Sequence, residues 1–444
     1  MRTEKNILGE MTLPDDVLYG INSAQAAENF ALHHKRVNLR LIHAMVTVKK
    51  AAAITFKKLG RGSEGVYEAV SAACDKILAG GYDDSFVTQA LQGGAGTSTN
   101  MNVNEVIANL ALLELGKQPG DYNTVHPLDD VNRGQSTNDV YPTALRIAAI
   151  IELRRLSDEC AKLQEALQVR ETEFDGIKKL GRTELMDAVP ITLGEEFGAF
   201  AQCIARDRWR IYKVEERLRQ VNIGGTAVGI ADSAERGYRF GVIEELRLLT
   251  GIGLAAAEYP MDITQNNDVF VEVSGLLKAL AVNLTKIAND LRLMNSGPYG
   301  GFAEIRLAAL QQGSTIMPGK VNPVIPEMVM QCAMRVIAND TAITLAASRG
   351  EFELNAFLPL IADSLLESLQ LLAQSVNLFR TRCIELLKPN SVQCKENLDN
   401  SYAFAAGYSK LLGYDIVSRI VHENSPKAAK KLLDALVSSE ETDR

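Results

Sequence analysis

The segment of this sequence best equipped for chemistry is Gly313–Pro323, which reads Gly-Ser-Thr-Ile-Met-Pro-Gly-Lys-Val-Asn-Pro. Its glycines let the backbone approach a ligand closely, while Ser314 and Thr315 supply adjacent hydroxyl groups. Lys320 adds a positive charge. Asn322 before a proline is typical of an N-cap and a first helical residue, so we expect a long helix to begin here. The alternative is an ordinary polar loop that precedes a helix.

Three other stretches place hydroxyl and amide side chains where we expect helices to follow. Such side chains usually do no more than cap a helix. Helix N-termini also attract anions, because free N–H groups and the positive end of the helix dipole point outward there. Together with the lysine of the glycine-rich segment, they would suit a small dicarboxylate. No dinucleotide or P-loop fingerprint accompanies them, so no phosphate cofactor is expected. The residues concerned are Thr97, Ser136, Thr137, Asn138, Thr183 and Glu184.

Long amphipathic helices are the elements expected to position these residues. Apolar residues recur every three or four positions along Asp268–Leu293, which predicts one apolar stripe over several helical turns. Helices of this length that pack side by side form a bundle. Several carry apolar residues on more than one face, which predicts burial against other subunits. Residues 1–40 are expected to be irregular, and strand signals are sparse. The other long helices are expected over Val140–Val169, Gly194–Val221, Pro323–Ser348 and Pro359–Leu387.

Composition excludes several classes of protein. The 444 residues carry a net charge of -8, which argues against a nucleic-acid partner or an anionic membrane surface. No apolar run approaches the length of a membrane span, and no apolar region follows the charged N-terminus. The six cysteines are scattered without metal-ligand spacing, so neither a disulfide framework nor a zinc site is expected. These features predict a soluble cytoplasmic protein.

The glycine-rich segment resembles the signature loop of the fumarase/aspartase superfamily, Gly-Ser-Ser-x-Met-Pro-x-Lys-x-Asn-Pro, with Thr315 in place of the second serine. Ser136–Asp139 and Pro323–Glu327 are more similar to the aspartases of that superfamily, whereas His126–Pro127 is more similar to the fumarases. The resemblance covers nearly the whole chain. Its other blocks are Gly93–Asn109, Val131–Thr143, Gly181–Pro190 and Asn222–Gly229.

This resemblance implies an all-α fold with three domains, at residues 1–136, 137–388 and 389–444. The middle domain would be a long-helix bundle that forms a 20-helix core in a homotetramer, with each active site drawing on three chains. The implied reaction is anti elimination of ammonia from L-aspartate to give fumarate through an enediolate, without an organic cofactor, and no residue is assigned to a metal. The implied substrate is therefore a small amino-dicarboxylate.

The resemblance also implies a role for each candidate residue. Ser314 would be the base that removes a Cβ proton, and Asn138 would lie near the amino group. The carboxylate next to the deprotonated carbon would be held by Thr97, Ser136, Thr137 and Thr315. The other carboxylate would be held by Thr183, Lys320 and Asn322.

The chain departs from the family pattern at four positions. Glu184 replaces a His or Gln, Met186 a frequent Gln, and Gln25 and Tyr299 each replace a common Arg. Glu184 either binds the substrate ammonium or marks drift in a weakly active relative. Two alternatives therefore stay open. One is a related enzyme, either a hydratase for malate or a lyase for an amino-dicarboxylate other than aspartate. The other is an impaired homologue with a structural or regulatory role. The intact Ser314 argues against impairment.

Overall fold

The computed structural model describes residues 1–63, 65–232 and 235–442, and the chain they form is mainly helical. It divides into two compact units. Unit 1 comprises Met1–Leu156, Arg210–Lys278 and Arg335–Leu371, and unit 2 comprises Ser157–Trp209, Ala279–Met334 and Leu372–Arg444. The three-domain division remains a prediction, and its parts at residues 64, 233–234 and 443–444 lie outside the described residues.

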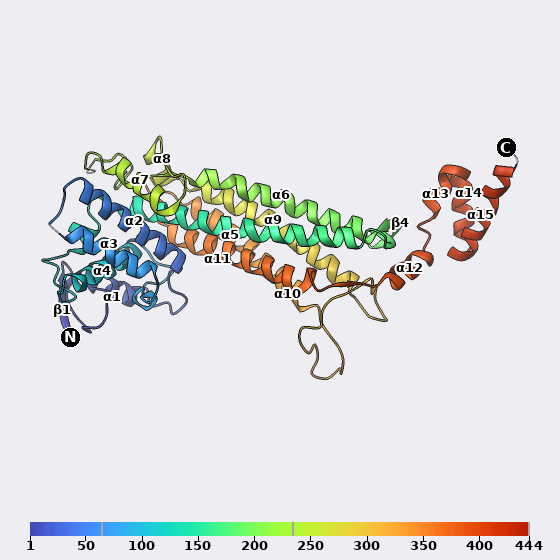
Figure 1. Cartoon of the computed structure of the whole chain (residues 1–444), viewed down its shortest axis with the longest axis horizontal. Helices are drawn as coiled ribbons and strands as arrows, with labels where there is room; N and C mark the ends of the chain where they lie inside the picture. The colour runs from blue at the N-terminus through green and yellow to red at the C-terminus, as the bar shows by residue number, and fades with distance from the viewer. Residues whose placement is uncertain (64, 233–234, 443–444) are drawn as a thin grey trace. The chain divides into compact units, whose positions relative to one another are not determined.

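Short helices fill the N-terminal part of unit 1 (Figure 1). Helix α2 packs against α3 and α7, and α4 packs against both α3 and α1. The buried face of α2 repeats at helical spacing, with Leu41, Met45, Val48 and Ala52 all buried, so its sequence pattern explains its packing. These helices span Ile21–Asn29 (α1), Leu39–Lys58 (α2), Val66–Leu78 (α3), Thr97–Glu114 (α4) and Tyr238–Thr250 (α7).

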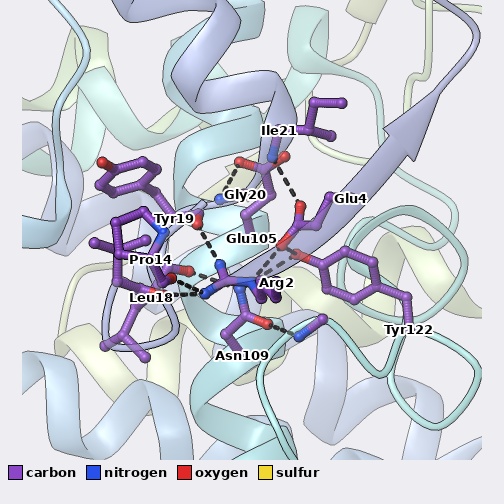
Figure 2. Close-up of polar contacts among 12 residues, drawn as sticks. Arg2, Glu4, Pro14, Leu18, Tyr19, Gly20, Ile21, Glu105, Asn109 and Tyr122 are labelled. Atoms are coloured by element: carbon purple, nitrogen blue, oxygen red, sulfur yellow. Dashed lines mark hydrogen bonds and ion pairs between the residues drawn. The ribbon is translucent and has the colours of Figure 1, made fainter. Parts of the chain in front are cut away.

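The expectation that residues 1–40 are irregular is wrong. They form an antiparallel hairpin, β1 (Arg2–Asn6) with β2 (Gly9–Leu13), followed by α1. Figure 2 shows why this segment is ordered. The carboxylate of Glu105 on α4 accepts the Gly20 N–H at 2.9 Å, and Glu4 accepts the Ile21 N–H at 2.8 Å. Arg2 donates to three backbone carbonyls of residues 14–19. These polar contacts join residues far apart in sequence, so apolar periodicity carries no sign of them.

Five long helices carry the apolar stripes that the sequence predicts. Along α9, residues Val273, Leu280, Leu284 and Ile287 are fully buried, as the spacing requires. Within unit 1, the Ser274 hydroxyl donates to Asp340 at 2.8 Å and so joins α9 to α10. These helices span Thr137–Glu173 (α5), Leu193–Leu218 (α6), Asp268–Met294 (α9), Val324–Ala347 (α10) and Leu358–Phe379 (α11). The prediction of an all-α fold with long helices is thus confirmed, with short strands as minor additions.

Unit 2 contains a hairpin and a set of C-terminal helices. Strands β3 (Lys178–Thr183) and β4 (Met186–Thr192) pair antiparallel, and helix α12 (Ser391–Asp399) packs against β3. This hairpin was not predicted from the sequence. A two-residue strand, β7 (Ile305–Arg306), pairs with β8 (Lys388–Pro389). The last three helices contact one another (Figure 1) and span Ala405–Leu412 (α13), Tyr414–Glu423 (α14) and Pro426–Thr442 (α15).

Shorter elements complete the description. A π-helical turn lies at Pro127–Val131, and a second such turn, Arg380–Ile384, follows α11. A parallel pair of two-residue strands joins Gln220–Val221 to Ala255–Ala256. In the part of the chain that the structure describes, no helix is long and apolar enough to cross a membrane. A helix over Pro260–Gln265 and a 3-10 turn over Asp83–Ser85 are the remaining elements.

Candidate active site

The glycine-rich segment forms a closed loop in unit 2. At its stem the Gly313 N–H donates to the Lys320 carbonyl at 3.1 Å, and the Asn322 side chain donates to the Gly313 carbonyl at 2.7 Å. Helix α10 begins at Val324, one residue later than expected. Asn322 therefore ties the two ends of the loop together, where the sequence analysis expected an N-cap.

The Ser314 side chain is hydrogen-bonded to the backbone of its own loop. Its Oγ accepts two backbone hydrogen bonds, from the Ile316 N–H at 3.2 Å and from the Met317 N–H at 2.8 Å. The hydroxyl proton is left for another partner, because both of these contacts use the oxygen as an acceptor. The exposed side chains of Thr315 and Lys320 lie on the same loop, which borders a shallow hollow of about 500 Å³.

A second group of candidates lies at the start of α5 in unit 1. The Oγ1 of buried Thr137 accepts a hydrogen bond from the Asn100 side chain at 3.0 Å, and the Oγ of Ser136 accepts one from the Asn138 N–H at 3.1 Å. Each hydroxyl thus keeps its own proton available to donate to an anion. The Asn138 amide donates to the Ala227 carbonyl at 2.8 Å and so ties this turn to the loop around residues 224–229.

Asp139 positions this second group, and the sequence analysis gave it no role. Its buried carboxylate accepts the N–H groups of Ser136 at 3.1 Å, Gly224 at 3.1 Å and Thr226 at 2.9 Å. Burial raises its pKa to about 7, although these N–H donors and nearby Lys49 act in the opposite direction. An acidic residue placed directly before the apolar run that begins at Val140 was the signal that could have identified it.

Thr97 confirms the expectation of a hydroxyl at a helix start. It is the first residue of α4 and follows Gly96, whose left-handed backbone (φ 93°) a side chain would strain. The Thr97 side chain is exposed and donates to the Gly94 carbonyl at 2.8 Å. A bound carboxylate would have to compete with that local bond.

For Thr183 and Glu184 the expected setting is wrong. Thr183 ends β3 and Glu184 lies in the hairpin turn, whereas α6 begins only at Leu193. The argument from a helix N-terminus therefore does not apply to this stretch. Glu184 and Leu185 both have a left-handed backbone, with φ of 53° and 65°, and both side chains are exposed. The neighbouring guanidinium of Arg182 pairs with Glu304 at 2.9 Å.

The candidates divide between the two units, and within unit 2 the hairpin turn and the signature loop are separate segments. Unit 1 holds Thr97, Ser136, Thr137 and Asn138, and unit 2 holds Thr183, Glu184, Ser314, Thr315, Lys320 and Asn322. Of the positions that depart from the family pattern, Gln25 accepts from Asn6 at 2.9 Å, while Met186 and Tyr299 are exposed. Within the described ranges, no group of three or more His, Cys, Asp or Glu side chains is arranged to hold a metal ion.

Comparisons with known proteins relate this chain to lyases. The model of a family described as Lyase matches residues 9–338. Aspartate ammonia-lyase from Pseudomonas canavaninivorans is 42% identical over 94% of this chain and 89% of that enzyme, and aspartate ammonia-lyase from Bacillus subtilis is 42% identical over 95% and 89%. Two solved structures are also similar. Fumarate lyase:delta crystallin from Brucella melitensis bound to cobalt has a TM-score of 0.92 at 44% identity, covering 98% of this chain and 93% of that one. Class II fumarase from Schistosoma mansoni has a TM-score of 0.94 at 30% identity, covering 100% and 97%.

The loop stem offers a test that needs no knowledge of the substrate. A Cβ added at Gly313 would meet the Lys320 carbonyl oxygen at 2.4 Å and the Asn322 nitrogen at 2.9 Å, and both are backbone atoms of the stem. We expect Gly313→Ala to open the stem and to speed amide hydrogen exchange in peptides covering residues 311–322. The matched control is Gly319→Ala, which meets nothing within 4 Å and adds only the strain of a left-handed alanine, about 1–2 kcal/mol. Equal exchange in the two variants would show that the stem is not the constraint.

Proposed function

This chain belongs to the fumarase/aspartase superfamily of lyases, and from that membership we propose that it eliminates ammonia from L-aspartate to give fumarate. The observation that carries the proposal is the signature loop, in which Ser314 Oγ accepts two backbone N–H groups. Aspartate ammonia-lyases that are 41–43% identical over most of the chain support it. The reaction breaks the Cβ–H and Cα–N bonds of the substrate, and the proton and ammonia leave from opposite faces.

Ser314 is the proposed base. A serine hydroxyl in water is almost entirely un-ionised at neutral pH, so it needs local stabilisation of its alkoxide. The N–H groups of Ile316 and Met317 supply it, because hydrogen bonds to a charged form favour that form. Lys320 adds a positive charge on the same loop, and closure of the loop over substrate would exclude water and strengthen these interactions.

The substrate's two carboxylates are proposed to be held by hydroxyl and cationic donors. Ser136 and Thr137, whose protons are free to donate, suit the carboxylate next to the deprotonated carbon. There the negative charge of the enediolate develops, so fixed donors stabilise the transition state more than the ground state. Thr97 and Thr315 are assigned to the same carboxylate. The other carboxylate is assigned to Thr183, Lys320 and Asn322, and the substrate amino group lies near Asn138.

The residue at the family's His or Gln position favours loss of ammonia from the substrate over loss of water. Hydroxide leaves only after protonation, so a hydratase needs an acid at this position, whereas an ammonium group already carries its proton. The family position that holds a His or Gln is occupied here by Glu184, which can bind an ammonium by a charge-assisted hydrogen bond. Fumarate hydration remains the second candidate, because the similar solved structures include a class II fumarase.

One assay tests the proposed reaction directly. The purified enzyme is incubated with L-aspartate, L-malate or argininosuccinate in parallel, and fumarate is followed by its ultraviolet absorbance. We expect fumarate from L-aspartate and little from the other two. Preferential turnover of L-malate would replace the proposal with the hydratase alternative. No turnover of any substrate by the folded protein would instead favour a structural or regulatory homologue.

We further propose that the enzyme is a cytoplasmic homotetramer whose active sites each use residues from three chains. Apolar side chains on its long helices support this, since Val282 is 53% exposed, Met334 56% and Leu345 63% in the single chain. Sedimentation velocity at micromolar concentration should give the mass of four chains. A stable monomer that retains full activity would contradict the assembly.

Ser314→Ala should abolish elimination while the fold and the assembly persist, because the side chain lies on a loop outside the helical core. We expect a loss in kcat of about a hundredfold or more, the usual scale of a positioned general base. Circular dichroism and sedimentation serve as controls for the fold and the assembly. Turnover close to that of the unmodified enzyme would remove Ser314 as the base.

Glu184→Gln should lower kcat/KM for L-aspartate and tighten inhibition by L-malate. The carboxylate attracts an ammonium and repels a dicarboxylate that has none, so removing its charge changes the two affinities in opposite directions. We expect the ratio of the two to change roughly tenfold. Leu185→Ala, which alters the same turn without changing charge, is the matched control. An unchanged ratio in Glu184→Gln would mean that Glu184 does not contact the substrate.

A further inference from the structure

A cluster of four charged side chains lies at the base of the β3–β4 hairpin in unit 2. Glu304 is completely buried, and its Oε2 lies 2.8 Å from the ammonium of Lys179, while its Oε1 lies 2.9 Å from the guanidinium of Arg182. Lys179 also pairs with Glu196 at 2.7 Å. Two cations thus face two carboxylates. Burial lowers the pKa of Lys179, but the carboxylates of Glu196 and Glu304 outweigh it, so that the pKa is raised.

Glu304 joins several elements through its backbone as well as its side chain. Its N–H donates to the Met294 carbonyl at 2.8 Å at the end of α9, and its carbonyl accepts the Asn390 N–H at 2.9 Å. Its Oε1 also accepts from the Asn397 side chain of α12 at 3.3 Å. One buried residue therefore holds together the end of α9, the strand β3 and the C-terminal helix α12.

The segment of unit 2 that carries Thr183 and Glu184 begins next to this cluster. Arg182 directly precedes Thr183 and the hairpin turn at Glu184. Its guanidinium is fixed on one side by Glu304 and lies 4.3 Å from the ring centroid of Phe302. Glu304 itself lies nine residues before Gly313, where the signature loop begins. The carboxylate of Glu304 therefore anchors the hairpin.

From this arrangement we infer that Glu304 is a positioning residue for the active site, which acts through Arg182 to fix the turn that carries Thr183 and Glu184. This inference rests on the proposed function, in which that turn binds the substrate. A stabilising role alone would not require the Arg182–Glu304 contact to lie directly next to the binding residue Thr183. A buried ion pair gives little net stability, because desolvation offsets the attraction, but it fixes geometry when its members are fully bonded.

The test compares Glu304→Gln with Glu215→Gln. The carboxylate of Glu215 is also mostly buried and pairs with Arg154 at 2.8 Å. Glu215, however, lies in the part of α6 that belongs to unit 1, and α6 carries no candidate site residue. Both variants should lose thermal stability. Well below their melting temperatures, only Glu304→Gln should lower kcat/KM for L-aspartate, by about tenfold to a hundredfold, the cost of a small misplacement of binding groups. A loss equal to that of Glu215→Gln would overturn the inference.

Two further measurements make the outcome decisive. Amide hydrogen exchange over residues 178–192 should speed up in Glu304→Gln and stay unchanged in Glu215→Gln, and this readout needs no substrate. If Glu304→Gln does not fold, Arg182→Lys takes its place, because it keeps the positive charge but loses the planar guanidinium that contacts both Glu304 and the Phe302 ring. Its kcat/KM should fall in the same range, and full activity in that variant would overturn the inference.

Thr183→Ala separates the failure of this inference from that of the proposed function. If Thr183→Ala leaves KM for L-aspartate unchanged, the assignment of the hairpin to substrate binding fails, whatever Glu304 does. If Thr183→Ala raises KM while Glu304→Gln changes neither KM nor hydrogen exchange in the hairpin, the binding role stands and the positioning role of Glu304 is wrong.

Discussion

The proposed base, Ser314, depends on the two hydrogen bonds that the backbone of the signature loop donates to its Oγ. A serine can remove a proton from carbon only where its alkoxide is stabilised, and these two N–H groups donate to its oxygen. They hold that geometry because Gly313, Lys320 and Asn322 close the stem of the loop. The chemistry proposed for Ser314 therefore depends on a backbone conformation, which the glycine at the stem permits.

Elsewhere in the chain, long helices and buried polar anchors serve the same end. Helix α5 begins at Thr137 and presents a hydroxyl whose proton is free, and Asp139 secures the turn just before it. In unit 2, Glu304 does for the β3–β4 hairpin what Asp139 does for the start of α5. In both places a buried carboxylate that accepts several hydrogen bonds fixes a segment that carries groups proposed to bind the substrate.

Periodic features could be predicted from the sequence, and features that depend on distant polar contacts could not. The stripe on α9 specifies a helix by spacing alone, and the start of α5 follows from the cluster of hydroxyl and amide residues before it. The hairpin at Thr183 was missed because its strand residues, such as Lys179, are charged and are buried only through Glu196 and Glu304. The ordered structure of the first residues was missed for the same reason, because one of the contacts that hold it is the hydrogen bond from the Gly20 N–H to Glu105 on α4. The roles of the site residues rest on resemblance, because spacing places residues on elements but does not assign them to substrate groups.

The central claim, a single base acting on one face of the substrate, is tested most directly by running the reaction backwards in D₂O. Fumarate and ammonium are incubated with the enzyme, and the L-aspartate formed is analysed by proton NMR. The account predicts one deuterium at C3, in a single stereochemical position on the face opposite the new amino group. Deuterium in both C3 positions, or on the same face as the amino group, would contradict it.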